Sequence, residues 1–204
     1  DDELVREGSW LTWRRKEAMA HLSALGTEHY QQLGGADQRF RLEYSPSVPP
    51  AEDSLSTEER FRESHSAVRQ RESVLAATEV GPHRDDLALS INGLNMGTFA
   101  SRGEARTAAL TLRLAEASYI SSVRGEEPIV LLDDVLSEMD ISRRRRVLEK
   151  ITGYEQVMIT TTDPELIQQL LGPEAAYFRV EDGQVIAQER SPQSAPSAQE
   201  STEE

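Results

Sequence analysis

Apolar and polar residues follow a helical period over most of the first third of the chain. Residues 3–33 are rich in Leu, Ala, Glu, Arg and Gln and contain no proline, which predicts a long helix that ends at a Gly-Gly pair. A short β-prone piece, residues 40–44, precedes a proline-rich connector that neither helix nor sheet tolerates well. Ser56 and Glu59 have the spacing of a capping box, so a second, polar helix is expected from there to about Ala77.

The pattern changes after Thr78, where strands and helices alternate. Alternating apolar residues on either side of the turn Asn92-Gly93 predict a β-hairpin through Phe99. The elements expected after it are, in order, a helix over 103–122, a strand over 128–132, a helix over 142–152, a strand over 155–160, a helix over 164–171 and strands over 175–180 and 184–188. Strands that alternate with helices imply βαβ units, so we expect an α/β fold with a mainly parallel sheet and flanking helices.

These two patterns divide the chain into three expected parts. A helical arm, residues 1–77, precedes an α/β lobe, residues 78–190, and a tail, residues 191–204, contains only Ser, Pro, Gln, Ala, Glu and Thr. Such a tail cannot bury a core and should be disordered. The helices of the arm are so polar that they are expected to lean on each other or on DNA, and an ordinary helical subdomain is the alternative.

Composition narrows the class of protein. The chain has 204 residues and no cysteine, which excludes disulfides and Cys-ligated zinc. It also has no apolar stretch long enough to span a bilayer, and these features together indicate a cytoplasmic protein. Its 36 acidic and 22 basic residues give a net charge of −14, the wrong sign for a protein that coats DNA with its whole surface. Any contact with nucleic acid would therefore use a local basic patch or a part that this chain does not contain.

The strongest chemical signal is the run Ile-Val-Leu-Leu-Asp-Asp-Val-Leu-Ser-Glu-Met-Asp, residues 129–140. Its four apolar residues predict a buried parallel strand that delivers Asp133 and Asp134 to the edge of the sheet, where α/β folds bind ligands. Asp133 suits Mg²⁺, which prefers hard oxygens, and Asp134 would orient or deprotonate an attacking water. A lone aspartate after such a strand is more often the cap of a turn. The adjoining residues 137–140, which resemble the D-loop of ABC-type ATPases, favour a nucleotide site.

A second candidate site lies at the start of the helix predicted upstream of this strand. Its residues are Ser101, Arg102, Gly103 and Glu104. A hydroxyl, a flexible glycine and free N–H groups at a helix start form an anion site, and the anion should be a γ-phosphate. Plain N-capping by Ser101 is the alternative, and the order of the motifs along the chain favours the phosphate site.

The chain contains no Gly-x-x-x-x-Gly-Lys-[Ser/Thr] loop, which an ATPase of this kind needs to cradle the phosphates. Its only lysines are Lys16 and Lys150, and neither follows a glycine. We therefore interpret the chain, which begins with Asp1, as the carboxyl-terminal part of a longer protein, and expect it not to bind ATP appreciably by itself.

Four motifs in register resemble those of the RecF family of bacterial recombination mediators. They are Gly-Pro-His-Arg-Asp-Asp-Leu (81–87), Ser-Arg-Gly with Arg106-Thr107 and Leu-x-Leu-Ala-Glu (112–116), Leu-Leu-Asp-Asp-Val-Leu-Ser-Glu-Met-Asp (131–140) and Ile-Thr-Thr-Thr-Asp (159–163). The resemblance implies an SMC-like ABC-type ATPase of DNA replication, repair and the SOS response. Such a protein binds ATP and Mg²⁺, dimerises around ATP, binds single-stranded and gapped DNA, and helps load recombinase with RecO and RecR.

The resemblance also assigns roles to the matching residues. By this resemblance, the residues Ser101, Arg102, Gly103 and Glu104 would contact the γ-phosphate across the dimer. Asp133 would bind magnesium, and Asp134 would act on the attacking water. Ser137 and Asp140 would form dimer contacts, and Asp163 would occupy the switch position. The family usually carries Gln-Gln where this chain has Glu104-Ala105. A glutamate adds negative charge near phosphate and would call for compensation by Arg102 or Arg106.

Four more residues, His83, Arg84, Arg143 and Arg144, are candidates for contact with DNA or between lobes. The first two lie in a motif for which an exposed turn closed by Asp85 is the alternative. Arg143 and Arg144 belong to a run of four arginines, and a solvated helix surface is the alternative interpretation of that run. Two rival functions remain: a non-catalytic module that docks a repair partner, and an SMC-like ATPase of another system such as an anti-phage nuclease.

Overall fold

The computed structural model describes residues 2–35, 37–137, 139–171 and 175–188. The helices are α1 (Asp2–Gly34), α2 (Ser54–Leu75), the 3-10 helix η1 (Pro82–Arg84), α3 (Met96–Phe99), α4 (Arg102–Arg124), α5 (Ile141–Ile151) and α6 (Pro164–Leu171). The strands are β1 (Phe40–Ser45), β2 (Asp86–Ile91), β3 (Leu94–Asn95), β4 (Val130–Asp133), β5 (Val157–Thr160), β6 (Phe178–Glu181) and β7 (Gln184–Ala187). The predicted disordered tail lies outside the described residues.

The strands form three separate sheets. The first is antiparallel with the order β1-β2-β3, the second is the parallel pair β4-β5, and the third is the antiparallel hairpin β6-β7. The predicted α/β class is confirmed, but among the described strands parallel pairing is confined to β4 and β5. The chain divides into two compact units, Asp1–Thr161 and Thr162–Glu204, and the domain boundary expected at residue 77 falls inside the first.

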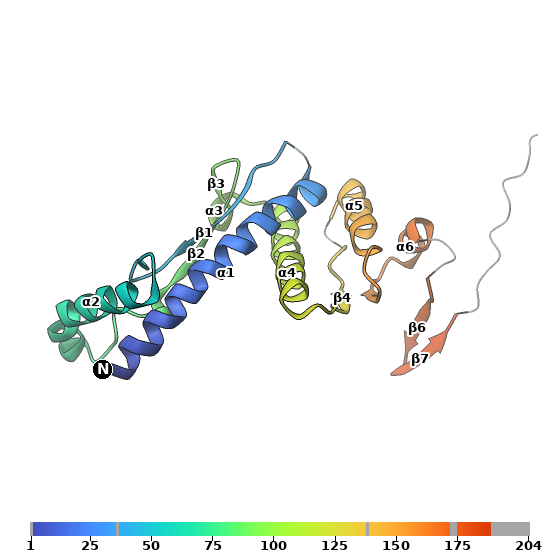
Figure 1. Ribbon diagram of the computed structural model, residues 1–204. Helices are drawn as coiled ribbons and strands as arrows, with labels where there is room; N and C mark the ends of the chain where they lie inside the picture. The colour runs from blue at the N-terminus through green and yellow to red at the C-terminus, as the bar shows by residue number, and fades with distance from the viewer. Residues whose placement is uncertain (1, 36, 138, 172–174, 189–204) are drawn as a thin grey trace, which may run out of the picture. The chain divides into compact units, whose positions relative to one another are not determined.

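Helix α1 is the element on which the first unit is assembled. Helix α2 packs beside its N-terminal part, and α4 packs beside its C-terminal part (Figure 1). Two glycines make the approach close: a Cβ added to Gly8 would lie 2.8 Å from Cζ of Phe61, and one added to Gly26 would lie 2.7 Å from Cε1 of Phe40. Glycine weakens a helix, and here it is what lets α2 and β1 come so near to α1.

Two apolar clusters hold these elements together. The first lies among α1, β1, β2 and α4 and consists of the buried residues Tyr30, Phe40, Leu42, Ile91 and Ala108. Within it the rings of Tyr30 and Phe40 stack with centroids 5.3 Å apart. The second cluster joins α1 to α2 through Val5, Val48 and Phe61. Full burial of a side chain of this size contributes about 1.5–3 kcal/mol.

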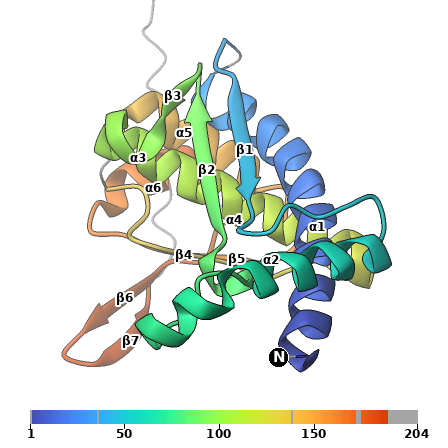
Figure 2. The ribbon, with the colours of Figure 1, turned by 90° about the vertical axis from the view of Figure 1, so that its left-hand side faces the viewer.

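Strand β1, from the predicted arm, pairs along its whole length with β2, from the predicted lobe (Figure 2). The register aligns Phe40 with Ile91. Strand β2 then turns at Asn92 and Gly93, whose φ angles of 51° and 80° are those of a tight hairpin turn. The hairpin was predicted, but its second strand ends at Asn95, and residues 96–99 form helix α3 instead. Met96 thereby turns back against the first apolar cluster.

The start of α2 also differs from the prediction. The N-cap is Asp53, whose Oδ1 accepts the Ser56 N–H at 2.8 Å and whose Oδ2 accepts the Ser56 hydroxyl at 2.9 Å. The capping box expected from Ser56 and Glu59 is therefore wrong. Both residues lie inside the helix, because an aspartate three residues earlier offers a better acceptor for the same backbone group.

The parallel pair β4-β5 is exposed on one face. Val130 and Leu132 are buried, whereas Leu131 between them is 67% exposed and its partner on β5, Met158, is 59% exposed. Successive side chains of a strand point to opposite faces, so one face packs on the fold and the other faces outward. The predicted burial of this strand on both faces is wrong, because the described residues supply a covering layer on one side only. No described helix combines the length and apolarity that crossing a membrane requires.

His29 is buried where α1 meets α4, with its Nε2 3.0 Å from Oγ of Ser118. Burial, and then the cation of Lys150, lower the pKa of His29 below its ordinary value. As the pH falls, the unfolded chain therefore takes up a proton before the folded chain does. The free energy of unfolding should accordingly fall as the pH drops below about 6.5.

We expect His29→Gln to remove part of this loss of stability between about pH 7 and about pH 5.5, since glutamine does not titrate. Urea unfolding at a series of pH values measures it. His21→Gln is the matched control for replacing a histidine of the same helix, because His21 is exposed and stacks on Tyr119. Equal pH dependence in His29→Gln and the parent would contradict the assignment.

Candidate functional site

Asp133 and Asp134 lie at the carboxyl end of β4, as predicted. The parallel register puts Asp133 opposite Thr160, the last residue of β5. The Thr160 hydroxyl donates to Oδ1 of Asp133, and the N–H of Asp134 donates to the Thr160 Oγ1 at 3.1 Å. Both aspartates are exposed, so their carboxylates can be reached from solvent.

The backbone of Asp134 has a left-handed conformation, with a φ of 48°. A residue other than glycine adopts it at a cost of order 1 kcal/mol, and such residues cluster at functional sites. Its carbonyl oxygen accepts Nη1 of Arg106 at 3.1 Å and the Ser137 hydroxyl at 3.1 Å. Arg106 comes from the second turn of α4. It therefore connects the paired aspartates directly to this helix, which we call the signature-like helix because its start, residues 101–104, resembles the signature loop of ABC-type ATPases.

The segment that follows, which resembles a D-loop, is held by side chains of its own. Arg144 donates from Nε to the carbonyl of Met139 at 2.8 Å and from Nη2 to that of Ser137 at 3.0 Å. Asp140 is the N-cap of α5 and accepts the N–H of Arg143 at 2.9 Å. The hydroxyl of Ser142 and this N–H lower the pKa of Asp140. The loop is therefore fixed at both ends.

Ser101 caps α4, and Glu104 closes a complete capping box with it. The Glu104 Oε2 accepts the Ser101 hydroxyl at 2.6 Å and the Ser101 N–H at 2.9 Å, while the Glu104 N–H donates to the Ser101 Oγ at 3.3 Å. These bonds, and after them the charge of Arg143, lower the pKa of Glu104. The Glu104 carboxylate thus occupies two donors, the Ser101 hydroxyl and N–H, that a phosphate at this helix start could also use.

Arg143 belongs to the site, and its effect on Glu104 was not predicted from the sequence. Compensation of the Glu104 charge was expected from Arg102 or Arg106. Arg102 is exposed and Arg106 reaches the Asp134 loop instead, whereas Arg143 of α5 lies near enough for its charge to lower the pKa of Glu104. Its Nη1 is also 3.5 Å from Oδ2 of Asp140. No pattern in the sequence predicts that the first turn of α5 lies near the first turn of α4.

The motif at residues 81–86 is anchored by Asp85, whose side chain is only 3% exposed. Its Oδ2 accepts the Tyr44 hydroxyl and Nη1 of Arg15 at 3.2 Å, and its Oδ1 accepts the N–H of Ser47 at 2.8 Å. Burial, and then the Asp85 carboxylate, raise the pKa of Tyr44 to about 12. A turn closed by Asp85, one of the two interpretations of this motif, describes the geometry.

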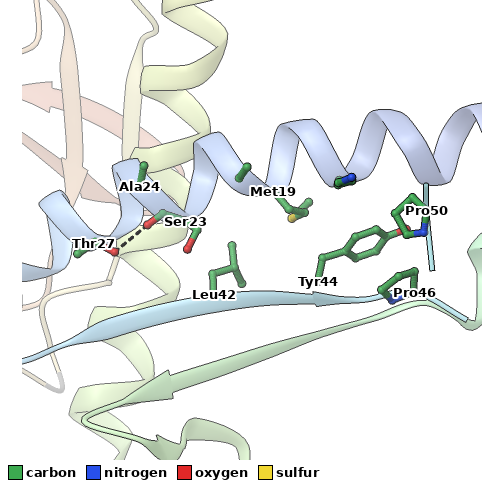
Figure 3. Close-up of a pocket in the computed structure, with 10 residues that line it drawn as sticks. Met19, Ser23, Ala24, Thr27, Leu42, Tyr44, Pro46 and Pro50 are labelled. Carbon is green, nitrogen blue, oxygen red and sulfur yellow. Dashed lines mark hydrogen bonds between the residues drawn. The ribbon is translucent and has the colours of Figure 1, made fainter. Parts of the chain in front are cut away.

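An open groove of about 690 Å³ lies elsewhere, between α1 and β1 (Figure 3). Its walls are small and apolar side chains of α1 with Leu42, Tyr44 and two prolines. None of the predicted site residues lines this groove. The two aspartates and the Ser101 turn therefore form an exposed surface site on loops.

Comparison with known proteins gives one consistent result. No family model matches the chain. It is 37% identical over 191 residues to the DNA replication and repair protein RecF of Lactobacillus delbrueckii subsp. bulgaricus, covering 92% of this chain and 50% of the relative. RecF of Geobacillus kaustophilus is 40% identical over 189 residues, covering 91% of this chain and 50% of that protein.

Solved structures agree. The recombination mediator protein RecF with ATP matches with a TM-score of 0.75 and 26% identity, covering 92% of this chain and 50% of that one. This chain belongs to the RecF family. A structure from work on ATP-driven dimerization of SMC ATPases matches with a TM-score of 0.52 and 14% identity over 87% of this chain and 89% of its own, which supports the fold alone. The chain spans about half the length of the RecF relatives it matches.

Within this RecF-type fold, the predicted site residues separate into two groups. Asp134 and Ser137 are hydrogen-bonded to α4 through Arg106, and Asp133 precedes Asp134 at the end of β4. Arg143 lies beside Asp140, and its charge also lowers the pKa of Glu104. Asp163 belongs to the second unit, immediately before α6, and its role as the switch residue stays a prediction.

His83 and Arg84 form the exposed part of the RecF-like turn. Nε2 of His83 lies 3.3 Å from the carbonyl oxygen of Thr78, and Nε of Arg84 donates to the same oxygen at 2.9 Å. Arg143 and Arg144 face the inside of the loop they support. Contact of these four residues with DNA or between lobes stays a prediction.

We expect Asp85→Asn to lower the free energy of unfolding by about 2 kcal/mol or more, because it leaves the Arg15 cation without its buried counter-charge. Asp86→Asn is the matched control: Asp86 is exposed and next in the chain, and its replacement should change stability by less than about 0.5 kcal/mol. Urea unfolding of both variants decides the matter. Equal effects would show that Asp85 does not anchor the turn.

Proposed function

We propose that this chain carries the paired aspartates and the signature-like helix of a RecF-type DNA-repair ATPase. The observation that supports this most is the Arg106 link, in which α4 donates to the Asp134 carbonyl at 3.1 Å and to the Ser137 hydroxyl at 3.4 Å. Two motifs that are far apart in the sequence, and that the resemblance assigns to opposite sides of the ATP sites of a dimer, are thereby connected within one subunit.

The donor set of β4 fits a hard divalent cation. Asp133 is exposed and holds one carboxylate oxygen against the Thr160 hydroxyl. Mg²⁺ usually keeps several waters and takes one or two carboxylates besides the phosphates of its substrate, so the Asp133 carboxylate alone would be a sufficient protein ligand. When bound, Mg²⁺ would neutralise charge on the phosphate oxygens.

The reaction proposed is hydrolysis of ATP by in-line attack of water on the γ-phosphate, with mainly electrostatic stabilisation. Asp134 would orient the water and accept its proton. Ser101, Arg102 and Gly103 would contact the γ-phosphate held by a second subunit, and Ser137 and Asp140 would contact that subunit. Glu104 competes with the phosphate for the Ser101 hydroxyl and N–H, as the hydrogen bonds of the capping box indicate.

The remaining parts of the proposal rest on the family. The phosphate-cradling loop that this reaction needs would come from residues outside this chain. A dimer formed around ATP would bind single-stranded and gapped DNA in the cytoplasm and help RecO and RecR to load recombinase, including during the SOS response. The outward apolar face of β4-β5 is consistent with a further layer in a longer protein.

In a full-length RecF-type protein that includes this chain, we expect Asp134→Asn to leave ATP binding intact and to slow hydrolysis at least about 100-fold, because the amide keeps the left-handed backbone but cannot accept the proton. Phosphate release and nucleotide binding are measured in parallel. Asp182→Asn is the control: it replaces another aspartate of similar φ, 49°, in the β6-β7 turn, and should hydrolyse ATP normally. Parental turnover by Asp134→Asn would remove this residue from the mechanism.

In the same protein, Glu104→Gln should tighten ATP-dependent dimerisation roughly fivefold. Glutamine can still close the capping box, but it no longer places a negative charge beside the phosphate, an effect worth about 1 kcal/mol at an exposed site. Light scattering with a non-hydrolysable ATP analogue reports it. Ser101→Arg gives the opposite control, since a bulky side chain should abolish dimerisation and spare nucleotide binding by monomers. If both variants dimerise like the parent, Ser101 is only a helix cap.

A further inference from the structure

The sequence contains three consecutive threonines at the end of β5, and the parallel register singles out the first of them. Thr160 is aligned with Asp133, whereas Thr161 and Thr162 follow the strand. The Thr160 hydroxyl is used twice: it donates to Oδ1 of Asp133 and accepts the N–H of Asp134 at 3.1 Å. A hydroxyl has only one proton to donate, so that proton is committed to the Asp133 carboxylate.

The backbone of Asp134 depends on the same side chain. Its N–H meets the Thr160 Oγ1 at 3.1 Å and the Thr160 carbonyl at 3.3 Å, and its own carbonyl is held by Arg106 and Ser137. A left-handed aspartate persists only where its surroundings fix it on both sides. Thr160 provides one of those sides, and Arg106 with Ser137 provides the other.

The Asp133 carboxylate is held through one oxygen. Among the described residues no hydrogen bond or ion pair is made to its Oδ2, and the side chain is exposed. A carboxylate fixed in this way presents its second oxygen in one orientation, which is how the neighbours of metal ligands raise affinity. If a methyl group replaced the Thr160 hydroxyl, the Asp133 carboxylate would be free to rotate.

We propose that Thr160 is a positioning residue that orients the Asp133 carboxylate for a hard divalent cation and holds Asp134 in its left-handed conformation. The first part rests on the proposed function, because it assumes that a metal is bound at Asp133. The second part concerns the protein alone. The two parts are therefore tested by separate measurements on the same variants.

The first measurement uses Mn²⁺ with the 204-residue chain, following the broadening of backbone amide signals by NMR. In the parent, broadening should begin at the amides of Asp133, Asp134 and Thr160, and Asp133→Asn should abolish it. Thr160→Val removes the hydroxyl and keeps the branched shape, and should require about tenfold more Mn²⁺ for the same broadening. Thr160→Ser keeps the hydroxyl and should behave like the parent.

Thr98→Val is the control for the loss of an exposed threonine hydroxyl outside the site, and it should leave the titration unchanged. Equal Mn²⁺ requirement in Thr160→Val and the parent would overturn the orienting role. No localised broadening in the parent would overturn the metal assignment of the proposed function, and with it this first part of the proposal.

The second measurement is hydrogen exchange of the Asp134 amide without metal. Exchange should be severalfold faster in Thr160→Val and parental in Thr160→Ser, because the valine variant loses the hydroxyl acceptor of that N–H and keeps only the longer bond to the Thr160 carbonyl. Thr160→Ala gives the same comparison, so the result does not depend on the folding of one variant. Unchanged exchange in both hydroxyl-free variants would overturn the positioning of Asp134, whatever the metal titration shows.

Discussion

The close packing of α1 is the constraint on which the first unit depends. Gly8 and Gly26 let α2 and β1 approach the helix more closely than a side chain would allow. Farther along, His29 contacts Ser118 of α4, and the carbonyl of Leu33 accepts Nε of Arg146 of α5 at 2.8 Å. Helix α1 contains no residue of the candidate site, yet it holds both helices whose first turns form that site.

The candidate site itself is held by polar bonds and lies on an exposed surface. One face of the β4-β5 pair supplies apolar packing, and the positions of Asp133, Asp134 and Ser137 are then fixed by the hydroxyl of Thr160 and the guanidinium of Arg106. Each such hydrogen bond contributes only about 0.5–1.5 kcal/mol, or somewhat more where a charge takes part. Several bonds on one short loop are needed to hold it, and this loop has them.

The sequence predicted the positions of helices and strands far better than it predicted their burial and their contacts. Helix α1 and the helix after Ser101 were predicted almost to their ends, because period and capping are local properties. Burial of β4 was not, because an apolar run reads the same whether one face or two are covered. The role of Asp85 as an anchor, and the influence of the Arg143 charge on Glu104, depend on how distant segments come together, and spacing along the chain does not predict this.

The two interpretations of Ser101, helix cap and phosphate contact, turn out to concern the same atoms. A cap satisfies the first N–H groups of a helix, and a phosphate at a helix start needs those same donors. In this chain the Glu104 carboxylate already takes the Ser101 hydroxyl and N–H, with Arg143 nearby to stabilise its charge. Under the proposed function, capping and phosphate binding would therefore be competing uses of the Ser101 hydroxyl and N–H, and the charge at position 104 would set the balance between them.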